Sequence, residues 1–177
     1  LDPMVEALGR VLRAGDHVVS SHFLFGNTNS LFQTLEAHGT SVSFVDATDA
    51  AAVERALTPQ TRLVFVETIA NPRTQIADLA RIGELCRRKG LLYVVDNTMT
   101  SPWLFRPKSV GAGLVVNALT KYVGGHGNAL AGSLTDTGVY DWSSFPNILP
   151  NYQGTDRRLW GITQVRKKGL RDLGGTL

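Results

Sequence analysis

Asp96 and Lys121 are the residues whose types and positions in the sequence are best suited to chemistry. Asp96 follows the apolar run Tyr93-Val94-Val95, so a strand would carry its carboxylate to a place with little water. A buried carboxylate needs a cationic or hydrogen-bonding partner, because burying it unpaired costs free energy. A helix cap or a turn is the simplest role for one aspartate at such a place. The alternative partner is a protonated pyridine nitrogen, because a fixed carboxylate keeps that proton on and makes the ring an electron sink.

Lys121 also follows an apolar run, and it precedes a glycine-rich loop at residues 124–128. Most lysines are solvated at the protein surface. A lysine that ends a strand can instead be partly desolvated, which lowers its pKa and allows it to form a Schiff base with an aldehyde. The neighbouring Thr120 offers a hydroxyl for a phosphate group. We therefore predict that Lys121 is partly desolvated and reactive.

Two further residues are candidates for contact with a planar ring. Phe25 follows the first apolar run and is placed to stack on a ring face, although an ordinary core phenylalanine is an equal alternative. Asn71 is placed to donate a hydrogen bond to a phenolic oxygen, although an Asn-Pro pair is more often a turn. Both residues thus have a functional and a structural interpretation.

Composition and spacing exclude several other kinds of site. The four histidines, His17, His22, His38 and His126, have no metal-type spacing, and the single cysteine, Cys86, adds no second ligand. We therefore expect no metal site. The chain contains neither a GxGxxG motif nor a GxxxxGK motif followed by Ser or Thr, which argues against a nicotinamide or nucleotide binder.

Charge and hydropathy also limit the partners of the chain. The net charge of +3 arises from 18 basic and 15 acidic side chains spread along the sequence. Short basic clusters at 87–89, 157–158 and 166–168 lack accompanying aromatic residues and indicate solvated helix faces, so we expect no nucleic-acid partner. No apolar stretch approaches the roughly twenty residues needed to cross a bilayer. With no pairing partner for Cys86, these features favour a reducing, cytoplasmic setting.

The elements that must position the candidate residues follow from the apolar pattern. Apolar runs predict strands at Asp16–Ser20, Val42–Val45, Leu63–Val66, Leu91–Val95, Leu114–Val116 and, less clearly, Leu130–Leu134. Helical spacing predicts helices at Met4–Leu12, Leu31–Ala37, Ala50–Leu57, Leu79–Cys86 and Arg158–Leu173. Several strands are apolar without alternation, which is typical of a sheet covered on both faces. The alternation of strand and helix predicts an α/β fold with a mainly parallel sheet in one domain.

Cap residues support these helices. Gly15, Gly39 and Gly90 each lie just past a helical segment, where a left-handed cap is favourable. Asp49 and Asp78 are placed as N-caps. The chain begins without methionine and stops soon after a predicted helix, so we expect it to be a piece of a longer protein.

Polar residues follow several of the predicted strands. In open α/β sheets, ligands collect beyond the carboxyl ends of the strands, at a point where the strand order reverses. The residues at these ends are Glu67, Thr68, Asn71, Asp96, Asn97, Thr98, Asn117, Thr120 and Lys121. We therefore expect carboxylate, amide, hydroxyl and amine groups to converge on one rim, with Thr98 among the ligand contacts.

Two sequence runs together resemble the Cys/Met-metabolism family of pyridoxal phosphate enzymes. The first is Val94-Val95-Asp96-Asn97-Thr98-Met99-Thr100-Ser101-Pro102, and the second is Leu119-Thr120-Lys121-Tyr122 followed by a Gly-Gly-His-Gly loop. The resemblance implies a fold-type I large domain, a three-layer α/β/α structure of which residues 1–177 would be the cofactor-binding part without the C-terminal domain. It also implies a homotetramer built as a dimer of dimers.

The same resemblance implies a role for each candidate residue. Lys121 would bond the aldehyde of pyridoxal phosphate, and Asp96 would hold its ring nitrogen. Asn71 would lie near the phenolic oxygen, Thr120 at the phosphate, and Phe25 over the ring. Thr98 would be a further cofactor contact.

The departures from the family pattern bear on the reaction. Phe25 replaces the usual tyrosine, so it can stack but cannot transfer a proton, and it resembles the O-succinylhomoserine sulfhydrylase branch. Asn27 stands where methionine γ-lyases have cysteine. Ala118 replaces the serine of the Ser-x-Thr-Lys motif, which removes one phosphate contact worth about 1 kcal/mol or somewhat more. The segment around Met4 does not match the loop whose amides normally bind the phosphate.

These features predict an enzyme of sulfur amino-acid metabolism that acts on an amino-acid substrate. The favoured reaction is γ-replacement on an activated homoserine ester, of the cystathionine γ-synthase or sulfhydrylase type. Two alternatives remain: γ-elimination, as in methionine or cystathionine γ-lyases, and a truncated domain without catalytic activity.

Overall fold

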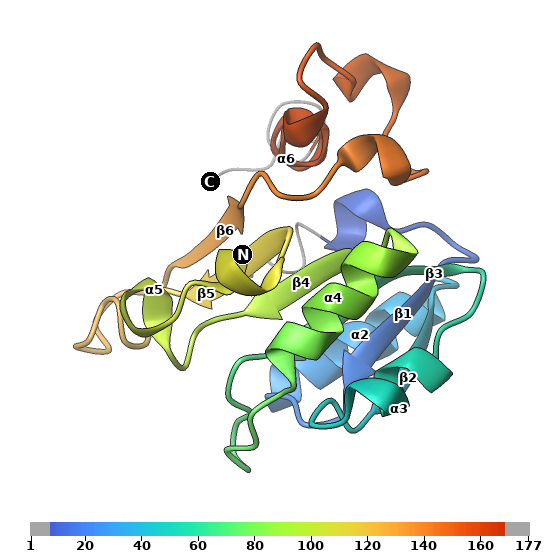
Figure 1. Ribbon diagram of the computed structural model, residues 1–177. Helices are drawn as coiled ribbons and strands as arrows, with labels where there is room; N and C mark the ends of the chain where they lie inside the picture. Colours follow the sequence, from blue (N-terminus) through green and yellow to red (C-terminus); the bar gives the residue numbers. More distant parts are fainter. Residues whose placement is uncertain (1–7, 169–177) are drawn as a thin grey trace.

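The computed structural model describes residues 8–168. Within them lies a six-stranded sheet with the order β2-β1-β3-β4-β5-β6 (Figure 1). The strands are β1 (His17–Ser21), β2 (Ser41–Val45), β3 (Thr61–Glu67), β4 (Leu92–Asp96), β5 (Leu114–Ala118) and β6 (Gly132–Asp136). The strands β1 to β5 pair in parallel, and β6 is antiparallel to β5. The prediction of an α/β fold with a mainly parallel sheet is therefore confirmed.

The central strands are apolar on both sides because both faces of the sheet are covered. Every residue of β3 except Arg62 is buried. On one face, Leu63 and Val94 belong to a core that includes Phe32 from α2 (Gly26–Ala37). On the other face, neighbouring strand residues pack with Val53 of α3 (Ala50–Arg55) and Ile82 of α4 (Leu79–Lys89). Figure 1 shows α3 and α4 on one side of the sheet and α2 behind it.

The ends of the helices show how well the cap residues could be predicted from the local sequence. Asp49 caps α3 as predicted, since its Oδ1 accepts a hydrogen bond from Ala51 N at 2.9 Å. Asp78 is the N-cap residue of α4, as predicted, but its side chain makes no cap hydrogen bond. It forms an ion pair with Arg81 at 3.8 Å instead. The helix α4 ends at Gly90, whose φ of 68° is in the left-handed region that glycine adopts without strain.

Helix boundaries differ from the predictions. The helix α3 ends two residues before the predicted Leu57, and α4 ends three residues after the predicted Cys86. The helix α2 begins at Gly26, ahead of the predicted Leu31. The start of the predicted Met4–Leu12 helix lies outside the described residues, although residues 8–11 are helical. The predicted Arg158–Leu173 helix is a 3-10 turn, η4 (Arg157–Leu159), followed by α6 (Trp160–Arg166), and its end lies outside the described residues.

The segment after β6 contributes to the core although its sequence lacks regular periodicity. Three short 3-10 helices, η2 (Trp142–Ser144), η3 (Pro150–Tyr152) and η4, lead into α6. Trp142 is fully buried and belongs to the same core as the N-terminal residues Leu8 and Val11. Figure 1 shows this segment, in orange and red, beyond β6.

Two shorter elements lie between β4 and β5. They are α5 (Ser101–Leu104) and η1 (Pro107–Val110). Among residues 8–168, no helix combines the length and apolar character that crossing a bilayer requires.

Candidate functional site

The carboxyl ends of β3, β4 and β5 line one pocket with a volume of about 830 Å³. A pocket of this size lies in the range that small-molecule and cofactor sites occupy. The loops after these strands and the start of α2 complete its wall. The structure brings all six sequence-predicted contacts to this pocket: Phe25, Asn71, Asp96, Thr98, Thr120 and Lys121.

Asp96 ends β4 in the middle of the pocket wall. In the sheet register it lies between Glu67 of β3 and Val116 of β5. Its Oδ1 accepts a hydrogen bond from Thr98 N at 2.8 Å, which forms a turn directly after the strand. Asp96 is half-buried, so it has more contact with solvent than the sequence suggested. The turn role and the ligand role are thus compatible, because the same carboxylate holds the turn and lines the pocket.

Thr98 connects the end of β4 to the end of β5. Its Oγ1 accepts a hydrogen bond from Ala118 N at 2.8 Å. Ala118 in turn accepts a bond from Lys121 N at its carbonyl oxygen, at 3.2 Å. Thr98 therefore helps to set the position of the Lys121 segment relative to Asp96, a role that the sequence did not reveal.

Lys121 lines the pocket but is exposed. The prediction that it is partly desolvated is wrong for the described residues. The strand β5 ends at Ala118, and the turn that follows carries Lys121 away from the sheet onto a loop. Residues 121–131 are all exposed, so no neighbouring segment among the described residues shields the ammonium group from water.

Thr120 closes the base of this exposed loop. Its hydroxyl oxygen accepts a hydrogen bond from Ala131 N at 3.1 Å and donates to the carbonyl oxygen of Ala131 at 3.4 Å. Both bonds link the start of the loop to its end. A phosphate at Thr120 would compete with the longer of the two bonds for the hydroxyl proton.

Phe25 and Asn71 lie at the pocket wall on two different loops. Phe25 precedes α2 and is 44% exposed, so it is not an ordinary core phenylalanine. Asn71 begins a tight turn in which Thr74 N donates to the carbonyl oxygen of Ala70 at 2.8 Å. Asn71 is therefore both a turn residue and part of the pocket wall.

Glu67 is a member of the site to which sequence reasoning gave no specific role. It is 7% exposed at the end of β3, and its carboxyl accepts bonds from Phe25 N at 2.7 Å and Asn71 N at 3.2 Å. The pKa of Glu67 is raised to about 7: burial is the largest cause and the nearby Asp96 adds to it, while the backbone bonds from Phe25 and Asn71 act in the opposite direction. Its place after the apolar run Leu63–Val66 was the available indication, but its partners are visible only in the fold.

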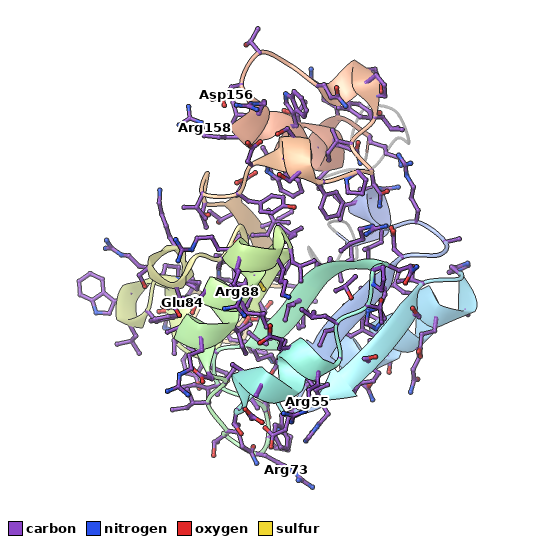
Figure 2. All side chains as sticks on the ribbon, turned by 45° about the vertical axis from the view of Figure 1, so that its right-hand side comes forward. Arg55, Arg73, Glu84, Arg88, Asp156 and Arg158 are labelled. Atoms are coloured by element: carbon purple, nitrogen blue, oxygen red, sulfur yellow. The ribbon has the colours of Figure 1, made fainter. Side chains whose placement is uncertain are left out.

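Positively charged groups other than Lys121 are absent from the described lining of the pocket. Arg73 is exposed, lies at the lower end of the molecule in Figure 2, and has its guanidinium 6.0 Å from the centre of the Phe23 ring. Arg157 forms an ion pair with Asp141 at 3.7 Å. No group of three or more metal-ligating side chains is found in residues 8–168.

Comparison with known proteins identifies the group to which the chain is related. The model of the family described as Cys/Met metabolism PLP-dependent enzyme, where PLP is pyridoxal phosphate, matches residues 3–165. The chain belongs to this family. The resemblance seen in the Asp96 and Lys121 motifs is thereby confirmed.

Curated members of the family are 35–41% identical to the chain over the aligned residues. An O-acetyl-L-homoserine sulfhydrylase from Leptospira meyeri is 35% identical, over 95% of this chain and 42% of that protein. A probable cystathionine gamma-synthase from Herpetosiphon aurantiacus is 41% identical, over 70% of this chain and 39% of that protein. An L-methionine gamma-lyase from Pseudomonas putida is 40% identical, over 98% of this chain and 39% of that protein. The chain thus spans less than half the length of these relatives.

Solved structures of the family share the fold. An O-acetylhomoserine sulfhydrylase from Wolinella succinogenes superposes with a TM-score of 0.87 at 39% identity, covering 98% of this chain and 49% of that one. A putative O-acetylhomoserine (thiol)-lyase from Campylobacter jejuni superposes with a TM-score of 0.83 at 28% identity, covering 97% of this chain and 46% of that one. The Campylobacter structure contains a pyridoxyl-lysine phosphate residue. The chain therefore has the fold-type I architecture, in part, that the resemblance implied.

The described pocket fits the ring end of the family's cofactor. It offers a half-buried carboxylate, an amine and a partly exposed phenyl group, from Asp96, Lys121 and Phe25. For the phosphate end, the lining offers the hydroxyl of Thr120, whereas Ala118 contributes only a methyl group. The donor set thus suits a pyridine ring and an aldehyde better than it suits a phosphate.

Proposed function

We propose that this chain carries the pyridoxal phosphate site of an enzyme that performs γ-replacement on an activated homoserine ester in sulfur amino-acid metabolism. The observation that carries the proposal is the meeting of Asp96, Phe25 and Lys121 in one pocket at the carboxyl end of the sheet. Membership of a pyridoxal phosphate family supports it. Sulfhydrylases from Leptospira and Wolinella and a probable cystathionine γ-synthase, which are similar to the chain, support γ-replacement.

The proposed roles follow from the chemistry of each side chain. When bound, pyridoxal phosphate supplies an aldehyde for the substrate amine and an electron sink for the bonds next to it. Asp96 would hold a proton on the ring nitrogen by its negative charge. Lys121 would bond the aldehyde through Nζ in the resting enzyme. When Nζ of Lys121 is not bonded to the aldehyde, its free amine would move protons between substrate carbons.

The remaining contacts would orient the ring. Phe25 would cover one ring face through its phenyl group, which can neither donate nor accept a proton. The Asn71 amide would donate to the phenolic oxygen, Thr120 would contact the phosphate, and Thr98 would hold the Asp96 and Lys121 segments together through Ala118 N. Phenylalanine at this position resembles the O-succinylhomoserine sulfhydrylase branch of the family, which favours replacement over elimination.

A γ-elimination reaction is the second candidate function. The observation in its favour is the 40% identity to an L-methionine gamma-lyase over nearly the whole chain. Asn27, which lines the pocket, differs from the cysteine that the family resemblance leads us to expect in such lyases.

We also propose that the active protein is a homotetramer, a dimer of dimers, in the cytoplasm. The exposed loop at residues 121–131 supports an assembly, because Tyr122, Val123 and Leu130 are 62%, 56% and 93% exposed around a proposed reactive lysine. Such apolar side chains are commonly covered by another chain or domain.

An assay of products tests the proposed function. The 177-residue chain and the full-length gene product would each be incubated with pyridoxal phosphate, O-succinyl- or O-acetylhomoserine, and cysteine or sulfide. We expect cystathionine or homocysteine as the main product of the full-length protein, and little or no turnover by the chain, whose described pocket lining lacks an arginine to bind the substrate carboxylate. A main product of 2-oxobutanoate and ammonia would favour elimination. Failure of the full-length protein to bind the cofactor would contradict the proposal.

A further inference from the structure

Glu67 is buried at the point where three parts of the pocket meet. It is the last residue of β3, it pairs in register with Asp96 of the neighbouring strand, and it is 7% exposed. A buried carboxyl group is costly unless its oxygens are hydrogen-bonded. The hydrogen-bond donors that compensate for the burial of Glu67 are therefore held in place by its carboxyl group.

The two carboxyl oxygens of Glu67 bond to two separate loops. Oε1 accepts from Phe25 N at 2.7 Å, and Oε2 accepts from Asn71 N at 3.2 Å. Phe25 is distant in sequence and belongs to the loop between β1 and α2, whereas Asn71 belongs to the loop after β3. One side chain thus joins, through backbone atoms, the two loops that carry the proposed ring contacts.

The backbone N–H groups involved depend on this carboxyl. Phe25 is the N-cap residue of α2, and its side chain cannot accept a hydrogen bond from the helix. A negative or partly negative group near the start of a helix is also favoured by the helix dipole. Without Glu67, both N–H groups would lose their protein partner at the pocket wall.

We propose that Glu67 is a positioning residue of this pocket, which holds the main chain of Phe25 and Asn71 at a fixed separation beside Asp96. Its effect on the cofactor rests on the proposed function. It acts through the backbone of these two residues, so that the Phe25 side chain meets a face of the ring and the Asn71 side chain meets its phenolic oxygen in a set geometry. Glu67 itself needs no contact with the cofactor for this role.

Amide hydrogen exchange in the cofactor-free full chain tests the proposed contacts directly. The comparison is made at pH 8, where the Glu67 carboxyl of the parent is ionised and both of its oxygens accept. Glu67→Gln keeps one acceptor oxygen, so we expect the amide of Asn71, which makes the longer bond, to exchange about tenfold faster, while the amide of Phe25 stays protected. Glu67→Ala removes both acceptors, and both amides should exchange faster by about tenfold or more. The control is Glu84→Gln, at an exposed residue of α4 that is labelled in Figure 2, and it should change neither amide.

A second measurement tests the consequence for the cofactor. We expect Glu67→Gln to weaken pyridoxal phosphate binding about tenfold and to reduce the induced circular dichroism of the bound cofactor, which reports a fixed ring orientation. Glu84→Gln should leave both unchanged. Unchanged exchange at both amides in Glu67→Ala would overturn the proposal. If both amides exchange faster in Glu67→Ala but the parent chain binds no cofactor, the positioning of the two loops by Glu67 is supported and only the proposed function is contradicted.

Discussion

At the scale of single residues, Asp96 combines a structural and a chemical task. Its Oδ1 holds the turn to Thr98 N, and the carboxylate lines the pocket at the end of β4. An amide in its place could still accept the bond from Thr98 N, but it would carry no charge to keep a proton on a ring nitrogen. The two tasks can therefore be separated by one substitution.

The substitution Asp96→Asn should leave the fold intact and largely remove turnover in the full-length protein. We expect a melting temperature within a few degrees of the parent and a loss of kcat of at least about a hundredfold, from the loss of charge stabilisation. Thermal melting followed by circular dichroism and steady-state assays would measure the two effects. Turnover within a factor of a few of the parent would mean that Asp96 is only a turn residue.

Glu67 gives the chain a pH dependence that follows from its burial. Its pKa is about 7 in the folded chain and 4.5 when unperturbed. The folded state therefore holds this proton more tightly, so the stability contribution is present below pH 4.5 and is lost as the pH rises through about 7. Between pH 5 and pH 8 the parent should lose about 2–3 kcal/mol more unfolding free energy than Glu67→Gln does.

Urea unfolding of both proteins at pH 5 and pH 8 would measure this difference. Other titrating groups, such as His17 with its lowered pKa, occur in both proteins and cancel in the comparison. Equal pH dependence of the two proteins would show that the carboxyl of Glu67 is ionised over the whole range.

The sequence identified several pocket residues because they end or follow apolar strands. Asp96 ends β4 and Thr98 follows it, and Thr120 and Lys121 lie within three residues of the end of β5. The exposure of Lys121 could not be predicted, because it depends on the turn after Ala118 and on what covers the loop. The partners of Glu67 were also out of reach, because a bond to Phe25 N joins residues far apart in the sequence.

At the scale of elements, strands were easier to predict than helix ends. All six strands lie within about two residues of their predicted positions, since a covered parallel sheet requires continuous apolar runs. The first turn of α2, from Gly26 to Ser30, has no apolar periodicity and was missed. Trp142 is buried by contacts with distant segments, so its surrounding sequence resembled a loop.

Gly83 provides a test of how α4 packs against the rest of the fold. A Cβ at this position would overlap the carbonyl oxygen of Val110 in η1, which is backbone and cannot easily move away. Although alanine favours helices by roughly 1 kcal/mol over glycine, we expect Gly83→Ala to destabilise the chain by about 1–3 kcal/mol. Chemical denaturation would measure the change.

The matched control is Gly9→Ala, in the helical residues 8–11, where no atom of the described residues 8–168 lies within 4 Å of the added methyl group. This variant should be as stable as the parent or slightly more stable. If Gly83→Ala were equally stable, α4 and η1 would not be in the close contact that the structure shows.

At the scale of the whole molecule, the chain contains one proposed site and less than half the length of its curated relatives. The described pocket lining supplies groups for a ring and an aldehyde, but no arginine for a substrate carboxylate. Cofactor binding by this chain and turnover by the full-length protein are therefore separate expectations. Cofactor binding is the central claim, because every proposed role depends on it.

Chemical trapping of the cofactor tests this claim most directly. The chain would be incubated with pyridoxal phosphate, reduced with borohydride, digested and mapped by mass spectrometry. The account predicts one stable pyridoxyl phosphate group on Lys121, and loss of that label in Lys121→Ala with Asp96 and Thr120 unchanged. Equal labelling of exposed lysines such as Lys108 and Lys167, or a label that persists in Lys121→Ala, would contradict it.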